Sequence, residues 1–356
     1  MDFAKAFDRV NHSLLINKLQ LYGIQGNCLT WIAKFLKDRL QSVVVNGSKS
    51  SSVNVRSGVP QSSVLGPCLF IAYINDLPEN LDANTRLFAD DTALYARITC
   101  TSDQEQLQRD LNCLANWEEK WDMKFHPQKC MAMSVTRKMQ PMISSYELHG
   151  HTLEKVDSAK YLGITIHSKM NWESHITAIT AKANKSLGFL RRNLKISSTA
   201  IKERAYMTYV RPLLEYASTV WDCHSQKNID RLEAVQRRAA RFVLGRYQNT
   251  SSVSNMMAAL KWPSLASRRK KARLAMLYKI QHGMARCPVI CSKLQQAPER
   301  QRRSHSQQLK LIPARTNYRA ESFLPTTISD WNALPNHIIE AGSLDTFVSR
   351  LDCLDI

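Results

Sequence analysis

The chain has 356 residues, enough for two or three domains, and it is 44% hydrophobic and 22% charged, a globular composition that excludes global disorder. Its 49 Lys and Arg against 30 Asp and Glu give a net charge of +19, which favours a polyanionic partner, most simply nucleic acid. An acidic membrane surface and a merely soluble basic protein are the alternatives. The sequence has neither a membrane-spanning apolar run nor a signal peptide, so we expect an intracellular protein without a membrane partner.

The N-terminal part of the chain predicts mixed α/β structure. Apolar residues at helical spacing predict helices at His12–Ile24 and Cys28–Leu40. Two β-rich runs, Gln41–Val45 and Val53–Arg56, then flank a turn at Asn46-Gly47. Because Asn-Gly fits the tight turns that join antiparallel strands, we expect a hairpin here.

A second hairpin is expected further along the chain. Val64–Leu77 predicts a helix, and Arg86–Ala96 then reads as two short strands with Asp90-Asp91 at the bend. The amphipathic pattern of Asp103–Trp121 predicts a long helix. Three more strands are expected, at Cys130–Thr136, Tyr146–Leu148 and Tyr161–His167.

From Asn171 onward the pattern is helical. Two apolar stripes are expected to face a core, one made of Ile176, Ile179, Ala183, Leu187, Leu190 and Leu194, the other of Leu232, Val235, Ala239 and Phe242. The polar, basic stretch Gln295–Arg319 predicts a linker or mobile arm. Residues 1–170 carry 19 basic and 17 acidic side chains, whereas residues 171–356 carry 30 and 13. We therefore predict domains at 1–170, 171–250 and 251–356, with the linker near 295–319.

The cysteines do not suggest a disulfide framework. There are nine, an odd number, and they are scattered among apolar neighbours, which favours buried thiols in a reducing compartment. The candidates for a zinc site are Cys223, His224, His282, Cys287, Cys291 and His305. They contain no CxxC pair, so isolated cysteines are the favoured interpretation.

Two acidic motifs stand out. Asp2 and Asp8 lie in DFAKAFD, and Asp90 and Asp91 lie in FADD at the expected hairpin bend. Carboxylates flanked by apolar strand residues are costly unless a positive charge neutralises them, and hard divalent cations prefer such oxygen ligands. Two metal ions held by shared carboxylates catalyse in-line phosphoryl transfer. The alternative for an Asp-Asp dipeptide is a solvated turn.

The order of the motifs resembles a known family. DFAKAFD, SGVPQSSVLGPCLFIAYINDL, LFADDTALYA, KCMAMSV and KYLGITI resemble the successive palm motifs of the reverse transcriptase of non-LTR (LINE-like, Jockey-type) retrotransposons. The resemblance continues through LEYASTVWD, RLEAVQRRAARFVLG and SFLPTTISDWNALPNHI, so it covers essentially the whole chain.

The resemblance implies a fold and an activity. The fold is an α+β palm of the right-hand polymerase type, with the fingers missing, followed by an all-α thumb and a C-terminal helical region. The activity is RNA-directed DNA polymerisation, in which two Mg²⁺ ions, or Mn²⁺ instead, promote transfer of dNTPs onto the 3′-hydroxyl of a DNA primer on an RNA template. Residence in the nucleus is implied, with a cytoplasmic ribonucleoprotein as the alternative, and the oligomeric state is left open.

The metal-site residues follow from the motif match. Asp2 matches the first metal-binding aspartate, and the carbonyl of Phe3 is an extra candidate ligand. Asp90 matches the second metal-binding aspartate, with Asp91 as its partner. Phe7 matches the bulky residue that lies beneath the incoming sugar and excludes a 2′-hydroxyl. Without the motif, Phe7 would be taken for a core aromatic.

Further roles are carried over in the same way. Gln61 matches the glutamine near the incoming nucleotide, and Gly58 and Pro60 shape its loop. Lys129 resembles the lysine that protonates the departing pyrophosphate, although by itself it would read as a solvated lysine. Tyr161-Leu162-Gly163 resembles the hairpin that grips the primer, and a plain strand-edge turn fits it equally well. Asp8 matches the motif too, with an expected structural role.

The sequence departs from the family at two points. Ser62 stands where the family usually has Gly, and its Cβ would be unfavourable if the position needs positive φ. The sequence begins one residue before Asp2, where the family has a fingers subdomain. We therefore expect a truncated copy, without fingers or endonuclease segment, whose Asp2 lies on a frayed terminus and whose activity is impaired. A catalytically inactive nucleic-acid-binding fragment of the same element is the alternative function, and a maturase-like RNA-binding protein is a third.

The basic half of the chain is expected to bind the template–primer duplex. The candidates are Lys182, Lys185, Arg191 and Arg192 beside the first stripe, Arg237, Arg238 and Arg241 beside the second, and the dense run Arg268, Arg269, Lys270 and Lys271. Contacts of this kind go to phosphates and depend on salt rather than on sequence. Charged helix faces that are only solvated are the alternative.

Overall fold

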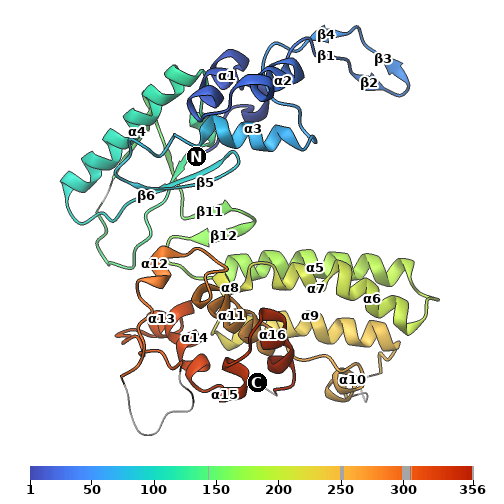
Figure 1. Cartoon of the computed structure of the whole chain (residues 1–356). Coiled ribbons are helices and arrows are strands. Elements are labelled where there is room, and N and C mark those ends of the chain that lie inside the picture. Colours follow the sequence, from blue (N-terminus) through green and yellow to red (C-terminus); the bar gives the residue numbers. More distant parts are fainter. Residues whose placement is uncertain (143, 249–251, 299–304, 306, 355–356) are drawn as a thin grey trace. The chain divides into compact units, whose positions relative to one another are not determined.

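The structure, a computed structural model, describes residues 1–142, 144–248, 252–298, 305 and 307–354 (Figure 1). The chain forms two compact units, Met1–Met170 and Asn171–Ile356. The boundary between them lies where the charge composition of the sequence changes. The further division into 171–250 and 251–356 stays a prediction.

The first unit contains four helices around one apolar core. They are α1 (His12–Leu21), α2 (Gly26–Leu36), α3 (Leu65–Ile74) and α4 (Thr101–Trp121), with short 3₁₀ turns η1 (Ala6–Asp8) and η2 (Pro127–Lys129). Each α-helix overlaps a predicted one, because the apolar spacing that predicted it also buries its inner face. Leu15, Leu19, Phe70, Tyr73 and Leu114 are buried at the centre of this core.

One charged side chain lies inside this core. Lys18 is 2% exposed, and its ammonium donates to the carbonyl of Tyr73 at 2.6 Å and to the carboxylate of Asp76 at 2.7 Å. It also lies 3.5 Å from the ring centroid of Trp121. Burial lowers the pKa of Lys18, while its hydrogen bond to Asp76 opposes the shift. The buried charge is therefore fully partnered, as its desolvation requires.

The strands of the first unit form six two-stranded pairings. β1 (Leu40–Gln41) pairs with β4 (Val53–Asn54), β2 (Val44–Val45) with β3 (Ser48–Lys49), β5 (Asn84–Phe88) with β6 (Asp91–Tyr95), β7 (Met131–Ala132) with β10 (Glu154–Lys155), β8 (Glu147–Leu148) with β9 (His151–Thr152), and β11 (Ser158–Tyr161) with β12 (Ile164–His167). Among the pairings of the described residues, that of β7 with β10 is parallel and the others are antiparallel. The hairpin predicted at Asn46-Gly47 is confirmed, since both residues have positive φ between β2 and β3.

Two strand predictions were wrong in extent. Tyr161–His167 is not one strand, because Leu162 and Gly163 have φ of 46° and 80° and reverse the chain between β11 and β12. Cys130–Thr136 yields only the two-residue β7. The apolar alternation of these segments predicted β structure correctly, but it carried no signal for where the chain turns.

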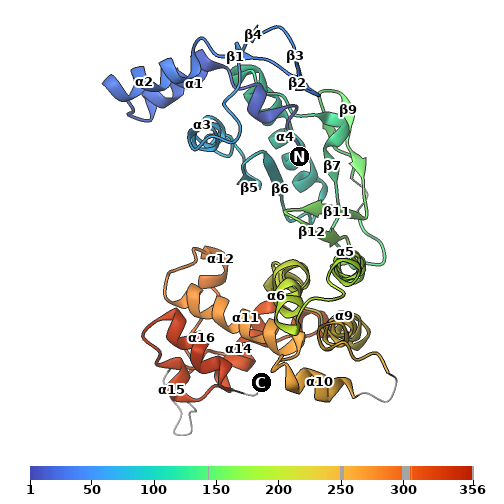
Figure 2. The same cartoon turned by 90° about the vertical axis from the view of Figure 1, so that its right-hand side faces the viewer.

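The second unit is helical (Figure 2). Its helices are α5 (Glu173–Asn193), α6 (Thr199–Tyr209), α7 (Arg211–Glu215), α8 (Ser218–Trp221), α9 (Gln226–Leu244), α10 (Val253–Ala259), α11 (Leu265–Gln281), α12 (Pro288–Cys291), α13 (Asn317–Ala320), α14 (Phe323–Asn332), α15 (Asn336–Ile339) and α16 (Leu344–Asp352). The long helices α5 and α9 pack together, and α11 contacts α8, α14 and α16. Both predicted apolar stripes face this core: Ile176 and Leu187 are buried on α5, and Leu232 and Val235 on α9.

The segment predicted as a linker is partly packed. Residues 299–304 and 306 of Gln295–Arg319 lie outside the described residues. His305 is 4% exposed and its ring contacts the carbonyl of Trp331 at 3.0 Å, while Leu309 is buried in a cluster with Leu274. These apolar and polar contacts anchor the segment at two points, and its role as a linker or mobile arm stays a prediction.

The cysteines, all within the described ranges, are free, but most of them are not buried. Cys130 and Cys223 are buried, whereas Cys28, Cys68, Cys100, Cys291 and Cys353 are exposed, so the expectation of buried thiols was wrong for most of them. No helix in the described part of the chain is long and apolar enough to cross a membrane.

Candidate active site and nucleic-acid interface

The N-terminal residues are paired with the β5–β6 hairpin. The amino group of Met1 donates to the carbonyl of Thr92 at 2.6 Å, and the amide of Thr92 donates to the carbonyl of Met1 at 3.4 Å. Both views place the N-terminus close to α4 and this hairpin (Figures 1 and 2). One edge of the segment that carries Asp2 is thereby fixed.

The other edge of the same segment pairs with the residues that follow α4. The amide of His126 donates to the carbonyl of Asp2, and the amide of Ala4 to the carbonyl of Lys124, each at 2.8 Å. Phe3 is 3% exposed, and its ring stacks on Phe125 with centroids 4.1 Å apart. The prediction that Asp2 lies on a frayed terminus was therefore wrong, because backbone pairing on both edges and a buried aromatic contact hold the segment in place.

This pairing brings the two acidic motifs together. Asp2 lies beside β6, which begins at Asp91, and Asp90 lies in the turn where Ala89 has a φ of 50°. Asp2 and Asp90 are half-buried, and Asp91 is exposed. The described residues contain no cluster of three or more His, Cys, Asp or Glu side chains in metal-binding arrangement. The carboxylates nevertheless suit Mg²⁺, which is usually held by one or two carboxylates, water and substrate phosphates.

The side chain of Lys129 lies beside the carboxylate of Asp2. Its Nζ is 3.8 Å from Oδ2 of Asp2, and the two side chains are 61% and 44% exposed. η2, which ends at Lys129, follows directly on the His126 pairing and so sets this position. A solvent-accessible ammonium beside a candidate metal ligand can donate a proton or bind an anion.

The loop after β4 is attached to the DFAKAFD motif. The amide of Gly58 donates to the carbonyl of Val10 at 2.7 Å, and the amide of Val59 to the carbonyl of Phe7 at 2.8 Å. Gly58 has a φ of 82°, and a Cβ there would lie 2.7 Å from the Cα of Asp8. Only glycine allows this approach. The ring of Phe7 is half-buried and stacks on Phe70 with centroids 4.4 Å apart.

The next residues of this loop carry a hydrogen bond and an unusual backbone angle. Nε2 of Gln61 donates to Oδ1 of Asp8 at 3.1 Å, with both groups exposed. Ser62 has a φ of 60°, so a non-glycine residue occupies the left-handed region at the position flagged by the sequence. Ser63 then fixes the loop, because its Oγ donates to the carbonyl of Pro60 at 2.8 Å and accepts from the amide of Gly66 at 2.9 Å.

The β11–β12 hairpin lies near the carboxylates. Burial raises the pKa of the Tyr161 hydroxyl, and the negative charge of Asp91 raises it further. The hydroxyl is therefore within electrostatic reach of Asp91. Gly163 forms the turn together with Leu162. The structure thus places Tyr161, Asp91 and Asp2 on neighbouring elements of one unit.

Sequence reasoning missed Glu118. Its side chain is 1% exposed and accepts hydrogen bonds from the amide of Phe125 and from the ring of His149. Burial raises the pKa of Glu118, and these two bonds oppose the shift. The signal was available, because Glu118 follows Leu111 and Leu114 at intervals of seven and four residues on the buried face of α4.

The first group of predicted nucleic-acid contacts is exposed. Lys182, Lys185, Arg191 and Arg192 lie on the solvent side of α5, and Arg237 and Arg238 lie exposed on α9, with Arg241 half-buried beside them. The ring of Tyr247 lies 5.2 Å from the guanidinium of Arg191, so the ends of α5 and α9 are adjacent. We call these basic side chains of the two packed helices the α5/α9 surface.

The second group of predicted nucleic-acid contacts, the four cations of α11, is engaged in ion pairs within the same unit. Arg268 pairs with Glu215, Arg269 with Asp222 at 2.7 Å, Lys270 with Asp330 at 3.2 Å and Lys271 with Asp352 at 3.2 Å. Arg269 is 1% exposed. The expectation that Arg269 contacts phosphate is corrected, because its guanidinium is buried against Asp222. For the half-buried Arg268, Lys270 and Lys271, phosphate contact stays a prediction that their ion pairs with carboxylates oppose.

Comparison with known proteins gives consistent matches. Residues 1–166 match the family described as "Reverse transcriptase (RNA-dependent DNA polymerase)". The chain is 33% identical over 262 residues to "Probable RNA-directed DNA polymerase from transposon BS" of Drosophila melanogaster, which covers 68% of this chain and 28% of the relative. It is 30% identical over 270 residues to "RNA-directed DNA polymerase from mobile element jockey" of the same species. That alignment covers 69% of this chain and 28% of the relative.

A relative with lower identity belongs to another kind of retrotransposable element. It is "Retrovirus-related Pol polyprotein from type-1 retrotransposable element R2" of Popillia japonica, 23% identical over 219 residues, with 54% of this chain and 36% of the relative covered. The chain therefore spans little more than a quarter of the length of the BS and jockey relatives, at 28% of each.

Proposed function

Because the chain belongs, through residues 1–166, to the reverse transcriptase family, we propose that it extends a DNA primer with dNTPs on an RNA template. The resemblance to non-LTR retrotransposons is confirmed by the jockey and BS relatives. Residues 1–166 have the palm-type fold of that family. The assignment of the helices that follow as a thumb is part of the proposal.

The observation that carries the proposal is the pairing of Met1–Ala4 between Thr92 and Lys124–His126. This pairing brings the segment of Asp2 beside β6, which begins at Asp91 directly after the turn that holds Asp90, although about ninety residues separate the two motifs. Positioning of charged groups contributes much of the rate in phosphoryl transfer. A segment held on both edges supplies that positioning.

We infer that Asp2, Asp90 and Asp91 hold two Mg²⁺ ions, or Mn²⁺ in their place. When bound, the ions would activate the primer 3′-hydroxyl and neutralise charge on the leaving pyrophosphate. The carbonyl of Phe3 is an additional candidate ligand. Asp2 is partly neutralised by Lys129 at 3.8 Å, which fits a carboxylate that needs a cation beside it.

The remaining roles belong to side chains around these carboxylates. Lys129 gives a proton to pyrophosphate, a role supported by its exposed ammonium 3.8 Å from the carboxylate of Asp2. Phe7, fixed by stacking on Phe70, forms a floor that favours deoxyribose over ribose. Gln61, oriented by Asp8, contacts the incoming nucleotide, and Gly58 and Pro60 shape the loop that presents it.

The α5/α9 surface is the proposed contact for the template–primer duplex. Its cations other than the half-buried Arg241 are exposed, whereas those of α11 form ion pairs. Binding through such side chains is electrostatic and independent of sequence. The Tyr161–Gly163 turn, beside Asp91, is the proposed contact for the primer end.

Primer extension on an RNA template with Mg²⁺ tests the proposal. The wild type is expected to incorporate dNTPs, and Asp90→Asn to lose incorporation at least a hundredfold. Asp38→Asn is the matched control, because Asp38 is an exposed aspartate in the loop after α2. Incorporation that survives Asp90→Asn would contradict the metal assignment.

A second candidate is a catalytically inactive fragment that binds nucleic acid. The left-handed backbone at Ser62, next to Gln61, favours it, because a side chain there stands where the family has glycine. Absence of incorporation by the wild type, together with retained duplex binding, would support this alternative.

A further inference from the structure

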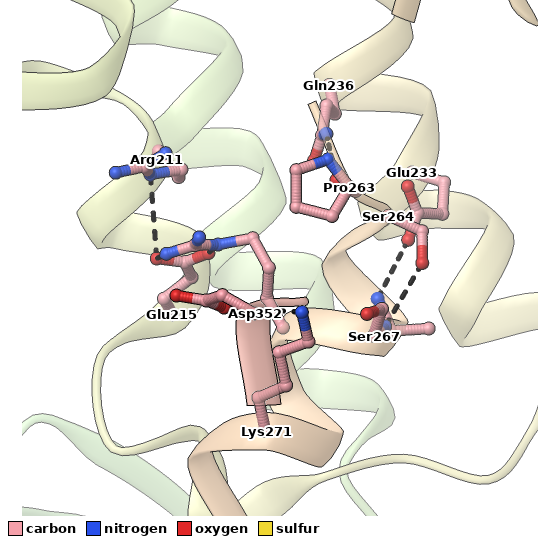
Figure 3. A network of polar contacts seen from close by, with 11 residues as sticks. Arg211, Glu215, Glu233, Gln236, Pro263, Ser264, Ser267, Lys271 and Asp352 are labelled. Atoms are coloured by element: carbon pink, nitrogen blue, oxygen red, sulfur yellow. Dashed lines mark hydrogen bonds and ion pairs between the residues drawn. The ribbon is translucent and has the colours of Figure 1, made fainter. Parts of the chain in front are cut away.

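A cavity of about 490 Å³ lies within the second unit, away from the acidic motifs. Its walls come from α6, α7, α9, α10, the loop between α10 and α11, α11, and the end of α16. Figure 3 shows part of this lining, with Arg211, Gln236, Lys271 and Asp352. A volume of this size is typical of sites for small organic ligands.

The lining carries an excess of positive charge. Four cations, Arg211, Lys261, Arg268 and Lys271, line the cavity with a single carboxylate, Asp352. Glu215 lies behind the two arginines and pairs with both. Lys261 forms no ion pair with any described residue. The charge that remains after this pairing suits an anion of one or two charges.

Two buried polar atoms at the cavity have no partner among the described residues. They are the hydroxyl of Tyr206, which is 0% exposed, and Oε1 of Gln236, which is 2% exposed. Tyr206 and Gln236 both line the cavity. Burial raises the pKa of the Tyr206 hydroxyl and the carboxylate of Glu215 raises it further, while Arg211 and Arg268 oppose the shift. Buried hydroxyls and amides are normally hydrogen-bonded, and a donor and an acceptor left open here indicate a ligand with polar groups.

An aromatic wall completes the site. The ring of Trp262 stacks on Tyr206 with centroids 4.5 Å apart, and its Nε1 donates to Glu203 at 2.8 Å. Met257 lines the same side. Nε2 of Gln236 donates to the carbonyl of Pro263 at 2.8 Å, which fixes the amide and leaves its oxygen open (Figure 3). The lining therefore combines a flat apolar wall, a cationic wall, one donor and one acceptor.

We propose that this cavity binds a nucleoside monophosphate, with the phosphate near Lys261 and Arg211 and the base against Trp262. The hydroxyl of Tyr206 and Oε1 of Gln236 bind polar groups of the same ligand. The ligand is either a free mononucleotide or the 5′-phosphorylated end of a nucleic-acid strand, because both present the same chemistry. This site is separate from the polymerase function and does not depend on it.

Calorimetric titration of the full chain with AMP tests the proposal, with adenosine and inorganic phosphate as the two partial ligands. AMP is expected to bind at least tenfold more tightly than either of them. Lys261→Ala is expected to weaken AMP binding about fivefold, because an exposed charge contact is lost. Lys293→Ala, which removes an exposed lysine of the same unit outside the cavity, should leave AMP binding unchanged.

Tyr206→Phe separates binding from folding. Removal of an unpartnered buried hydroxyl should raise the thermal midpoint of the free chain and weaken AMP binding about threefold to tenfold. A raised midpoint with unchanged AMP affinity would overturn the proposal, as would equal binding of AMP and inorganic phosphate or no AMP binding at millimolar concentration. Displacement of AMP by a 5′-phosphorylated oligonucleotide, but not by its 5′-hydroxyl form, would identify the strand end as the source. Failure of both oligonucleotides to compete would identify the free nucleotide.

Discussion

The buried carboxylate of Glu118 accepts a hydrogen bond from the backbone amide of Phe125. Phe125 pairs with Phe3 through an isolated β-bridge, and its neighbour His126 donates to the carbonyl of Asp2. The side chain of Glu118 therefore supports, through two backbone pairings, the segment that carries Asp2. It is a positioning residue, since it does not itself reach Asp2.

Removal of this support should destabilise the first unit. Glu118→Ala is expected to lower the free energy of unfolding by about 2–3 kcal/mol, because it leaves the amide of Phe125 and the ring of His149 without an acceptor. Urea denaturation measures the change. Glu119→Ala removes the exposed neighbouring carboxylate and should change the same quantity by less than about 0.5 kcal/mol. Equal effects of the two substitutions would contradict the assigned role.

The same carboxyl should give a pH-dependent stability. Burial raises the pKa of Glu118 in the folded chain above its ordinary value of 4.5, against the opposing charges of His149 and Lys124. The folded chain therefore binds this proton more tightly than the unfolded chain does. The resulting stabilisation is complete below pH 4.5 and is lost as the pH rises through the raised pKa.

Glu118→Gln removes this titration and keeps a hydrogen-bond acceptor. The stability of the wild type relative to Glu118→Gln should therefore fall as the pH rises from 4.5 toward neutrality. Urea denaturation of both proteins across this range measures the difference. A difference that stays constant, or that grows with pH, would show that burial does not dominate at this carboxyl.

The backbone at Ser62 is strained by its left-handed conformation. Ser62→Gly should raise the free energy of unfolding by about 0.5–1 kcal/mol, because glycine adopts a φ of 60° without the Cβ clash. Ser63→Gly is the matched comparison and should lower it, since Ser63 bonds both Pro60 and Gly66. Chemical denaturation of the two variants measures both changes. A destabilised Ser62→Gly would mean that the serine side chain makes a favourable contact there.

The two basic groups of the second unit should behave differently toward nucleic acid. Lys185→Ala on the α5/α9 surface should reduce the slope of log affinity against log salt by about 1, since one phosphate contact is lost. Lys270→Ala should leave the slope unchanged, because Lys270 neutralises Asp330. Titration of a labelled duplex at 50 to 200 mM salt, on the order of physiological strength, provides the slopes. If Lys270→Ala reduced the slope as much as Lys185→Ala does, the cations of α11 would bind phosphate as those of the α5/α9 surface do, and the prediction would be contradicted.

Local periodicity predicted much of the fold. The helices α4, α5 and α9 follow from apolar residues at intervals of three and four, and the β5–β6 hairpin follows from two apolar runs around Asp90-Asp91. Motif order, rather than periodicity, provided the candidate carboxylates. The exposure of basic side chains beside the apolar stripes of α5 and α9 was also predictable, because an amphipathic helix turns its polar face to solvent.

Contacts between distant residues were not predictable in this way. Met1–Ala4 is held by Thr92 and by Lys124–His126, and no local pattern marks these partners. The cations of α11 were predicted to contact nucleic acid because the sequence gives no sign of their ion pairs. Partners such as Asp222 and Asp330 lie about fifty residues away along the chain, one on either side. A single sequence shows the charge of a side chain but not the carboxylate that neutralises it.

The central claim is that the paired segment brings Asp2 to Asp90 and Asp91 so that together they bind divalent cations. Titration of the chain with Mn²⁺, followed by the decrease of the free-ion electron paramagnetic resonance signal, measures this binding directly. We predict that Asp2→Asn and Asp90→Asn each weaken Mn²⁺ binding at least tenfold, while Asp38→Asn leaves it unchanged. Equal Mn²⁺ affinity in the wild type and in both site variants would contradict the claim.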